Sequence, residues 1–179
     1  MSKIEQHGVG LVEVLVALVI LALGVLGFAA LQLRALNAAQ EATEQTIAIN
    51  TARDLVERIR INRTALVNYR VAINANTIND SQLTCIGTTS KDAVPSTTKI
   101  DLPKCNPAAM AAHDTTEILQ KAADQGQTII VANCIGSTLS CVYVAWGATT
   151  ITATNTTQCV NATTGTYIAG ATCLVMEAF

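Results

Sequence analysis

Six cysteines are the residues with the clearest chemistry in this chain of 179 residues. None of them forms a C-x-x-C pair, and His113 is the only histidine in their part of the chain, so the spacing does not match a zinc site. Six cysteines without the spacing of a metal site predict three disulfides, which form outside the cytosol. Many pairings are possible, and we expect the sequential one. The expected pairs are Cys85–Cys105, Cys134–Cys141 and Cys159–Cys173.

The other polar side chains do not assemble into a catalytic set. His113 stands alone after the leader, and with the cysteines paired no Ser-His-Asp or Cys-His set can be assembled around it. The sequence also has no Gly-rich phosphate loop and no carboxylate cluster. We therefore expect no catalytic residues, no metal, no cofactor and no enzymatic activity.

A single carboxylate, Glu13, directly precedes a long apolar segment. Residues 14–31 read VLVALVILALGVLGFAAL, and no charged residue lies between Glu13 and Arg34. About 20 helical residues match the roughly 30 Å thickness of the hydrocarbon core of a bilayer. The segment predicts one membrane-spanning helix, with the cysteine-bearing part of the chain outside the cytosol. Because a charge inside a membrane segment is costly, Glu13 either lies at the headgroup level of an anchor or has a specific partner.

The overall composition agrees with one apolar segment attached to a neutral domain. Half of the residues are hydrophobic, only 3% are aromatic and only 13% are charged. This excludes a disordered chain, a coiled coil and a polytopic membrane protein. The formal net charge of −2 argues against a nucleic-acid binder that relies on a basic face, so we infer no nucleic-acid partner.

The apolar segment predicts only the first half of a longer helix, over residues 10–62, because neither Gly nor Pro occurs from residue 28 to residue 62. In its second half a stripe of apolar residues recurs at helical spacing. The stripe consists of Ala48, Ala52, Leu55 and Ile59. Charged residues occupy the other faces, and we expect the arginines among them to be solvated.

The rest of the chain predicts a loop, a short helix and a small sheet. All three prolines lie in residues 74–107, which reads as a loop closed by Cys85–Cys105. A capping box, Asp114-Thr-Thr-Glu117, predicts a helix start, and Gly126 suits its end. Residues 128–133, 141–146, 149–154 and 167–176 predict three or four antiparallel strands. Between Asp124 and Glu177 lie 52 residues without a charge, 12 of them threonine.

The N-terminal residues Gly8-Val9-Gly10-Leu11-Val12-Glu13 resemble the class III signal of type IV prepilins and pseudopilins. The resemblance implies cleavage between Gly8 and Val9 by a prepilin peptidase and N-methylation of Val9. It also implies that Glu13 acts in assembly, by pairing with the N-terminal amine of a neighbouring subunit. The family usually has Phe where this chain has Val9.

Two later stretches are similar to the PilV-type minor pilins of type IV pili. They are Leu26-Gly-Phe-Ala-Ala-Leu-Gln32 and residues 48–63, which end in Glu-Arg-Ile-Arg-Ile-Asn-Arg. The resemblance implies an α+β type IV pilin fold, in which a long N-terminal α-helical spine packs on a C-terminal antiparallel β-sheet head. The implied parts are a leader (1–8), a transmembrane or fibre-core half-helix (9–33), an amphipathic half-helix (34–63) and a disulfide-stabilised head (64–179).

The same resemblance implies a minor pilin that takes part in pilus assembly and initiation in a tip-associated complex, and that supports twitching motility and adhesion. Its partners would be the prepilin peptidase, the major pilin, other minor pilins and a tip adhesin. The chain would sit in the inner membrane with its N-terminus cytoplasmic and its head periplasmic, and then enter the fibre. Two alternatives stay open: a type II secretion pseudopilin, and an uncleaved membrane-anchored periplasmic binding domain.

Overall fold

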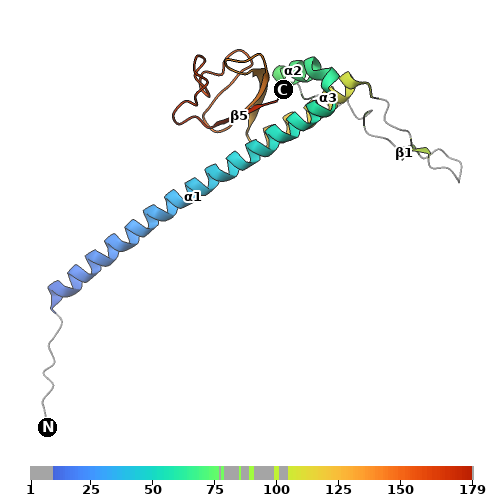
Figure 1. Ribbon diagram of the computed structural model, residues 1–179. Helices are drawn as coiled ribbons and strands as arrows, with labels where there is room; N and C mark the ends of the chain where they lie inside the picture. The colour runs from blue at the N-terminus through green and yellow to red at the C-terminus, as the bar shows by residue number, and fades with distance from the viewer. Residues whose placement is uncertain are drawn as a thin grey trace, which may run out of the picture. The chain divides into compact units, whose positions relative to one another are not determined.

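A computed structural model describes residues 10–76, 78, 85, 89–90, 99–100 and 105–178 (Figure 1). The chain divides into two units, Met1–Thr43 and Glu44–Phe179, each with its own organisation. The longest element, helix α1 (Leu11–Ile61), begins in the first unit and ends in the second. It corresponds to the helix expected over residues 10–62.

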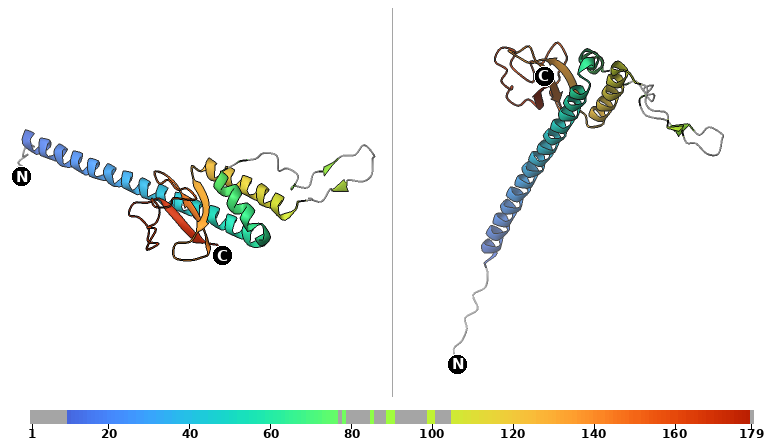
Figure 2. Two further views of the ribbon diagram at one scale, coloured as in Figure 1. Left: turned by 90° about the horizontal axis from the view of Figure 1, so that it is seen from above. Right: turned by 45° about the vertical axis from the view of Figure 1, so that its right-hand side comes forward.

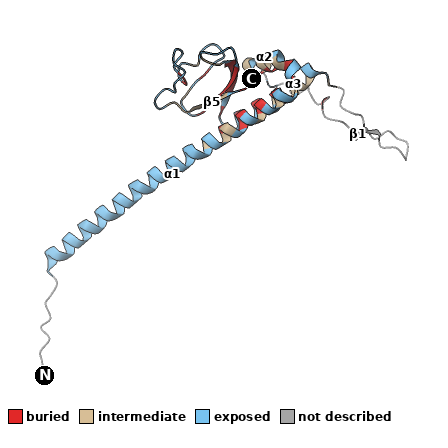
Figure 3. Ribbon diagram, viewed as in Figure 1, coloured by how far each residue is buried: buried red, intermediate tan, exposed pale blue. Residues whose placement is uncertain are grey.

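In the first unit, every described residue is exposed (Figure 3). The backbone N–H groups of Glu13 and Val14 both donate to the carbonyl oxygen of Gly10, which closes the first turn of α1. This part of α1 is long and apolar enough to cross a membrane. Its exposed side chains include most of the large aliphatic residues between Leu11 and Leu36.

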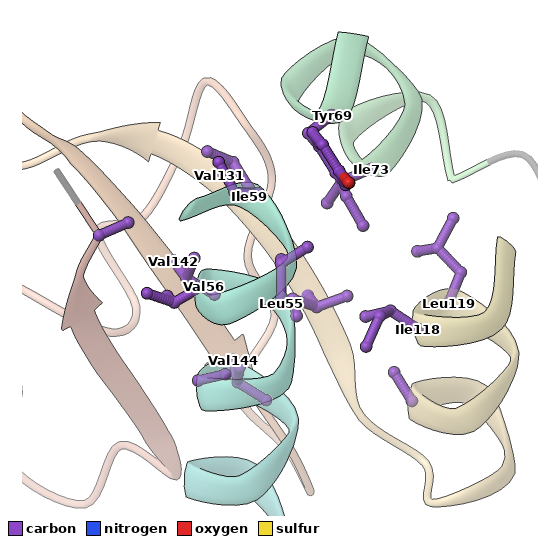
Figure 4. Packing of buried hydrophobic residues seen from close by; sticks show 14 of the residues in the cluster. Leu55, Val56, Ile59, Tyr69, Ile73, Ile118, Leu119, Val131, Val142 and Val144 are labelled. Atoms are coloured by element: carbon purple, nitrogen blue, oxygen red, sulfur yellow. The ribbon is translucent and has the colours of Figure 1, made fainter. Parts of the chain in front are cut away.

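In the second unit, the last turns of α1 enter a hydrophobic core. Ala48, Ala52, Leu55 and Ile59, the stripe that the spacing predicts, are all at most 1% exposed. The core continues into α2 (Leu66–Ala75), which follows the 3₁₀ turn η1 (Arg63–Ala65), and into α3 (Pro107–Asp124). Figure 4 shows Leu55 near Ile118 and Leu119 of α3, and Val56 near the sheet.

The sheet of the second unit has three antiparallel strands in the order β3-β4-β5. These are β3 (Thr128–Asn133), β4 (Ser140–Ala145) and β5 (Cys173–Glu177). One face packs into the helical core through Val131, Val142 and Val144, and the other face forms a second apolar cluster around Tyr143. A separate pair, β1 (Thr89–Ser90) and β2 (Lys99–Ile100), is antiparallel as well.

The N-cap of helix α3 lies eight residues earlier than the capping-box prediction. Its N-cap is Asn106, whose side chain accepts from the backbone N–H of Ala109 at 2.8 Å, and Pro107 occupies the first turn. Asn followed by Pro is the stronger start, because Asn accepts an unpaired amide and Pro has no amide to leave unpaired. The prediction that Asp114 starts this helix is wrong. Gly126, with φ of +65°, does follow the end of α3.

Two of the expected strands are mostly turns. In residues 149–154 only an isolated bridge, Thr152↔Asn155, is present, and of residues 167–176 only the last four belong to β5. Threonine hydroxyls bond locally there: the hydroxyl of Thr152 accepts from the backbone N–H of Asn155. Such local bonds compete with strand pairing, so a high β-propensity alone does not extend the sheet.

The outer edge of β3 is closed by one side chain of α2. The amide nitrogen of Asn74 donates to the carbonyl oxygen of Val131 at 2.8 Å, and its amide oxygen accepts from the Val131 N–H at 3.0 Å. This pair of bonds reproduces what a neighbouring strand would offer. Helix α2 therefore satisfies at Val131 a strand edge that an open sheet leaves unpaired.

Candidate functional site

The residues that the sequence assigns to processing and assembly lie at the start of α1. Gly8 and Val9, the predicted cleavage and methylation sites, lie outside the described residues. Glu13 occupies the first turn of α1 and is exposed. It shares one side of the helix with Ala17, Leu18 and Leu21. Its neighbours on this side are thus entirely apolar.

This part of the helix is built to be surrounded by apolar material. An exposed continuous apolar surface of this length is not tolerated in water and marks insertion into a membrane or packing against other helices. A carboxylate such as Glu13 then needs a charged or hydrogen-bonding partner once it is surrounded. Among the residues described on this side of α1, Glu13 is the one with a polar side chain.

All six cysteines are paired, in the sequential arrangement expected from the sequence: Cys85–Cys105, Cys134–Cys141 and Cys159–Cys173. The last two lie in the apolar cluster on the outer face of the sheet. There Cys159–Cys173 ties β5 to the preceding charge-free segment, closing a loop with a sequence separation of 14. Such a cross-link stabilises a fold mainly by restricting the unfolded chain.

A network of charged side chains joins the last turns of α1 to α3. Arg58 donates from Nε to Asp54 Oδ1 at 2.9 Å, and from Nη1 to Asp114 Oδ1 at 2.9 Å and Glu117 Oε2 at 2.6 Å. Lys121 Nζ lies 3.4 Å from Asp54 Oδ2. The Asp114 side chain is only 12% exposed. The guanidinium of Arg58 therefore donates hydrogen bonds to three carboxylates on two helices.

The same network continues into α2. The Tyr69 hydroxyl donates to the second carboxylate oxygen of Asp114, and the Asn62 amide donates to the carbonyl oxygen of Pro107 at 2.8 Å. Tyr69 is fully buried. Because buried polar groups stabilise a unique structure only when every one is paired, this network fixes how α1, α2 and α3 pack.

The network shifts the pKa values of its members. Burial alone would lower the pKa of Arg58, but hydrogen bonds to Asp54, Glu117 and Asp114 outweigh it and raise the pKa above its usual value. Burial would raise the pKa of Asp54, but the hydrogen bond and charge of Arg58, and then Lys121, lower it. Burial, followed by the hydrogen bond to Asp114, raises the pKa of Tyr69.

Two sequence-based interpretations are corrected by this network. Arg58 is not a solvated arginine like its neighbours, and Asp114 and Glu117 do not cap a helix; they bind Arg58 from the middle of α3. The i,i+4 spacing of Asp54 and Arg58, and the i,i+3 spacing of Asp114 and Glu117, were the available signals. Neither spacing shows that the two helices face each other.

We expect the Tyr69→Phe variant to lose about 1–2 kcal/mol of head stability at neutral pH, because Asp114 loses a buried donor. The raised pKa of Tyr69 means that the folded head holds the phenolic proton more tightly than the unfolded chain. Its contribution is complete below pH 10.0 and is lost as the pH rises through the higher folded-state value. Urea unfolding of the full-length chain in detergent, at pH values on both sides of 10.0, measures this difference.

The Tyr69→Phe variant should therefore lose less stability than the wild type as the pH rises above 10.0. Tyr143→Phe is the comparison, because Tyr143 is also buried but donates to the carbonyl oxygen of Asn133 instead of a carboxylate. Burial, and then the charge of Tyr167, raise the pKa of Tyr143 as well, so this variant should flatten the alkaline slope too, but less than Tyr69→Phe does. An unchanged alkaline slope in Tyr69→Phe would contradict the assignment.

No metal centre is formed by the part of the chain that the structure describes, where no group of three or more His, Cys, Asp or Glu side chains is placed to hold an ion. The charged network is internally paired. Its chemistry is structural, and the exposed apolar helix with Glu13 is the remaining candidate for function.

Comparisons with known proteins agree with this arrangement. Residues 5–29 match the prokaryotic N-terminal methylation motif, and residues 30–116 match a family described as Type IV pilin Tt1218. The two matches are adjacent, and together they run from the expected leader into α3. No curated protein and no solved structure matched the chain.

A long N-terminal helix followed by a small antiparallel sheet, with a type IV pilin family match, defines the α+β pilin fold. The match to a type IV pilin family and the match to the prepilin methylation motif together indicate a pilus-related pilin subunit. The apolar first unit and the motif fit a membrane-anchored pilin that a prepilin peptidase processes.

Proposed function

We propose that the protein is a minor pilin of the PilV type that takes part in the assembly and initiation of a type IV pilus, in a complex at the pilus tip. In this role it supports twitching motility and adhesion, together with other minor pilins, the major pilin and a tip adhesin. It is a structural subunit without enzymatic activity. It sits in the inner membrane with its head in the periplasm before it enters the fibre.

One observation carries the proposal: the methylation motif over residues 5–29 covers the start of a helix whose residues are exposed as far as Thr43. A subunit built this way can remain in the bilayer after its leader is removed, and can then exchange lipid for neighbouring helices. Helices associate in both environments through packing and paired polar groups. The PilV assignment itself rests on the resemblance of residues 26–32 and 48–63.

A type II secretion pseudopilin is the second candidate, because it shares the N-terminal signal. The Glu57-Arg-Ile-Arg-Ile-Asn-Arg63 ending of α1 and the six cysteines favour the pilus. A strain lacking the chain separates the two candidates. A pilus subunit predicts fewer surface pili with normal protein export, and a pseudopilin predicts the reverse.

We expect the chain extracted from membranes of its host to begin at methylated Val9. Intact-mass measurement tests this, because removal of residues 1–8 changes the mass by far more than the measurement error. A host lacking prepilin peptidase serves as the control and should give the full-length chain. A chain that keeps its leader in the peptidase-positive host would support an uncleaved membrane anchor and overturn the pilin proposal.

A further inference from the structure

The corner where α1 ends and α2 begins has an outer surface unlike the rest of the head. We call it the α1–α2 corner; it comprises the described residues from Arg53 to Val71. Four arginines of the corner point away from the core, and all but the half-buried Arg70 are exposed. These are Arg53, Arg60, Arg63 and Arg70. By contrast, residues 125–176 carry no charge at all.

The positive charge of the corner is largely uncompensated. Glu57 is the one exposed carboxylate on it, 3.2 Å from Arg60. Arg70 donates to Asn133 Oδ1 at 2.8 Å, a neutral acceptor that leaves its charge unpaired. Within the described ranges, the side chains of Arg53 and Arg63 have neither an ion pair nor a hydrogen bond. Arg58, the fifth arginine of the segment, differs because its charge is used internally.

Exposed aliphatic side chains accompany these charges. Ile61 at the end of α1 is 87% exposed, and Val67 and Val71 are 72% and 64% exposed. Val67 and Val71 are four residues apart in α2, so they lie on one face of that helix. The opposite face carries Tyr69 and Ile73, which are buried. Helix α2, the green helix that follows α1 after the short turn η1 (Figure 2), thus has an apolar inner face and an outer face that is also partly apolar.

We propose that the α1–α2 corner is the docking surface for a neighbouring pilin-type subunit that presents carboxylates around aliphatic side chains. Charge complementarity selects this partner: the unpaired arginines attract an acidic surface and orient it, while the three aliphatic side chains lose their exposure to water on contact. Arginine is well suited to such a contact, because its guanidinium binds a carboxylate through two parallel hydrogen bonds.

Two other ligands fit the corner less well. A phosphate backbone would meet Glu57 between Arg53 and Arg60, and single-stranded nucleic acid needs aromatic side chains for stacking, which the corner does not expose. Interfacial helices that bind anionic lipid usually carry Trp, Phe or Leu on the inserted face. The exposed face of α2 carries valines instead.

The inference rests on the proposed function in one respect: the proposed function identifies the partner as a neighbouring pilin-type subunit. The test replaces Val67 by the photoreactive amino acid p-benzoylphenylalanine in the full-length chain, expressed in its host, and irradiates intact cells. The crosslinked peptides are identified by mass spectrometry. We expect a crosslink to another pilin-type subunit at a peptide that contains Asp or Glu beside aliphatic residues.

Charge reversal gives the decisive comparison. Arg60→Glu combined with Arg63→Glu should reduce the crosslink yield by about tenfold, because attraction becomes repulsion at two positions. Arg60→Lys combined with Arg63→Lys keeps the charge and should retain most of the yield. The same photoreactive group at Ala153, an exposed residue of the charge-free segment, should not capture this partner.

Several results would overturn the inference: a crosslink to nucleic acid, to lipid or to a second copy of this chain, a yield that charge reversal leaves unchanged, or no crosslink at all. The mass of the chain is measured in the same cells. A processed chain without a crosslink refutes the docking surface alone. A chain that retains its leader refutes the proposed function as well.

Discussion

Replacing Arg58 by methionine is expected to lower the free energy of unfolding of the head by about 3 kcal/mol, because it leaves a buried carboxylate without its charge partner. Methionine keeps much of the side-chain volume, so the loss reports charge and hydrogen bonding more than packing. Asp114 suffers most, since it is almost fully buried and keeps only the Tyr69 donor. Trp146, the only tryptophan, is 5% exposed in the core and reports unfolding of the head by fluorescence.

Arg60→Met is the matched control, because Arg60 lies two residues away and, among the residues that the structure describes, pairs only with exposed Glu57. A surface pair of this kind contributes roughly 0–1 kcal/mol. The effect of Arg58 should also depend on pH. Arg58 lowers the pKa of Asp54, so this stabilisation is present above the ordinary value of 3.8 and is lost as the pH falls below it. If Arg58→Met and Arg60→Met lowered the free energy of unfolding equally at neutral pH, the network would not be a main source of the stability of the head.

Replacing Glu13 by alanine is expected to reduce the amount of this chain in sheared surface pili by about tenfold or more, while its leader is still removed. The reason is that a carboxylate in apolar surroundings is tolerated only with a partner, so its removal deletes a specific contact between subunits. Glu13 lies on an entirely apolar side of α1. Immunoblots of the pilus and membrane fractions, with intact mass, measure both steps.

Glu41→Ala is the control for Glu13→Ala. Glu41 is also an exposed carboxylate in the part of α1 that belongs to the first unit, but it lies beyond the apolar segment. It should enter pili at the wild-type level. Glu13→Asp should recover part of the incorporation, since it restores the charge on a shorter side chain. Normal incorporation of Glu13→Ala would remove the assembly role from this residue.

The long helix was predictable because its signals are local and repeated. An uninterrupted apolar run and a stripe at helical spacing both depend on neighbouring residues, and no Gly or Pro interrupts α1 after Gly27. Strands β3 and β4 were predictable for the same reason, as short runs of β-branched residues between turn residues. Helix α2 was missed, because Val67, Val71 and Ile73 are weak helix formers. It is stabilised by burial of Tyr69 and Ile73 against other elements, which is a tertiary effect.

The charged network could not be read from the sequence, because it joins residues that are 56 positions apart. Arg58 and its neighbour Arg60 look equivalent in a list of charges, yet one faces α3 and the other faces water. Which arginine turns inward depends on the angle at which two helices pack. The same argument applies to the α1–α2 corner. The sequence does not show which of its arginines are exposed, and only the structure separates Arg58, which binds α3, from the arginines on the surface.

The bonds of Asn74 to β3 bear on whether the sheet of the head can accept strands from other chains. Growth of a β-sheet by addition of strands from other chains needs a free edge on both sides of every unit that joins. Here one edge already has its hydrogen bonds at Val131 satisfied by a side-chain amide of the same chain. The other edge has a comparable bond, because the backbone N–H of Val175 in β5 donates to the Tyr167 hydroxyl at 3.0 Å. A strand from another chain would have to displace Asn74 at β3 or Tyr167 at β5, so each outer edge of the sheet resists strand addition at one position.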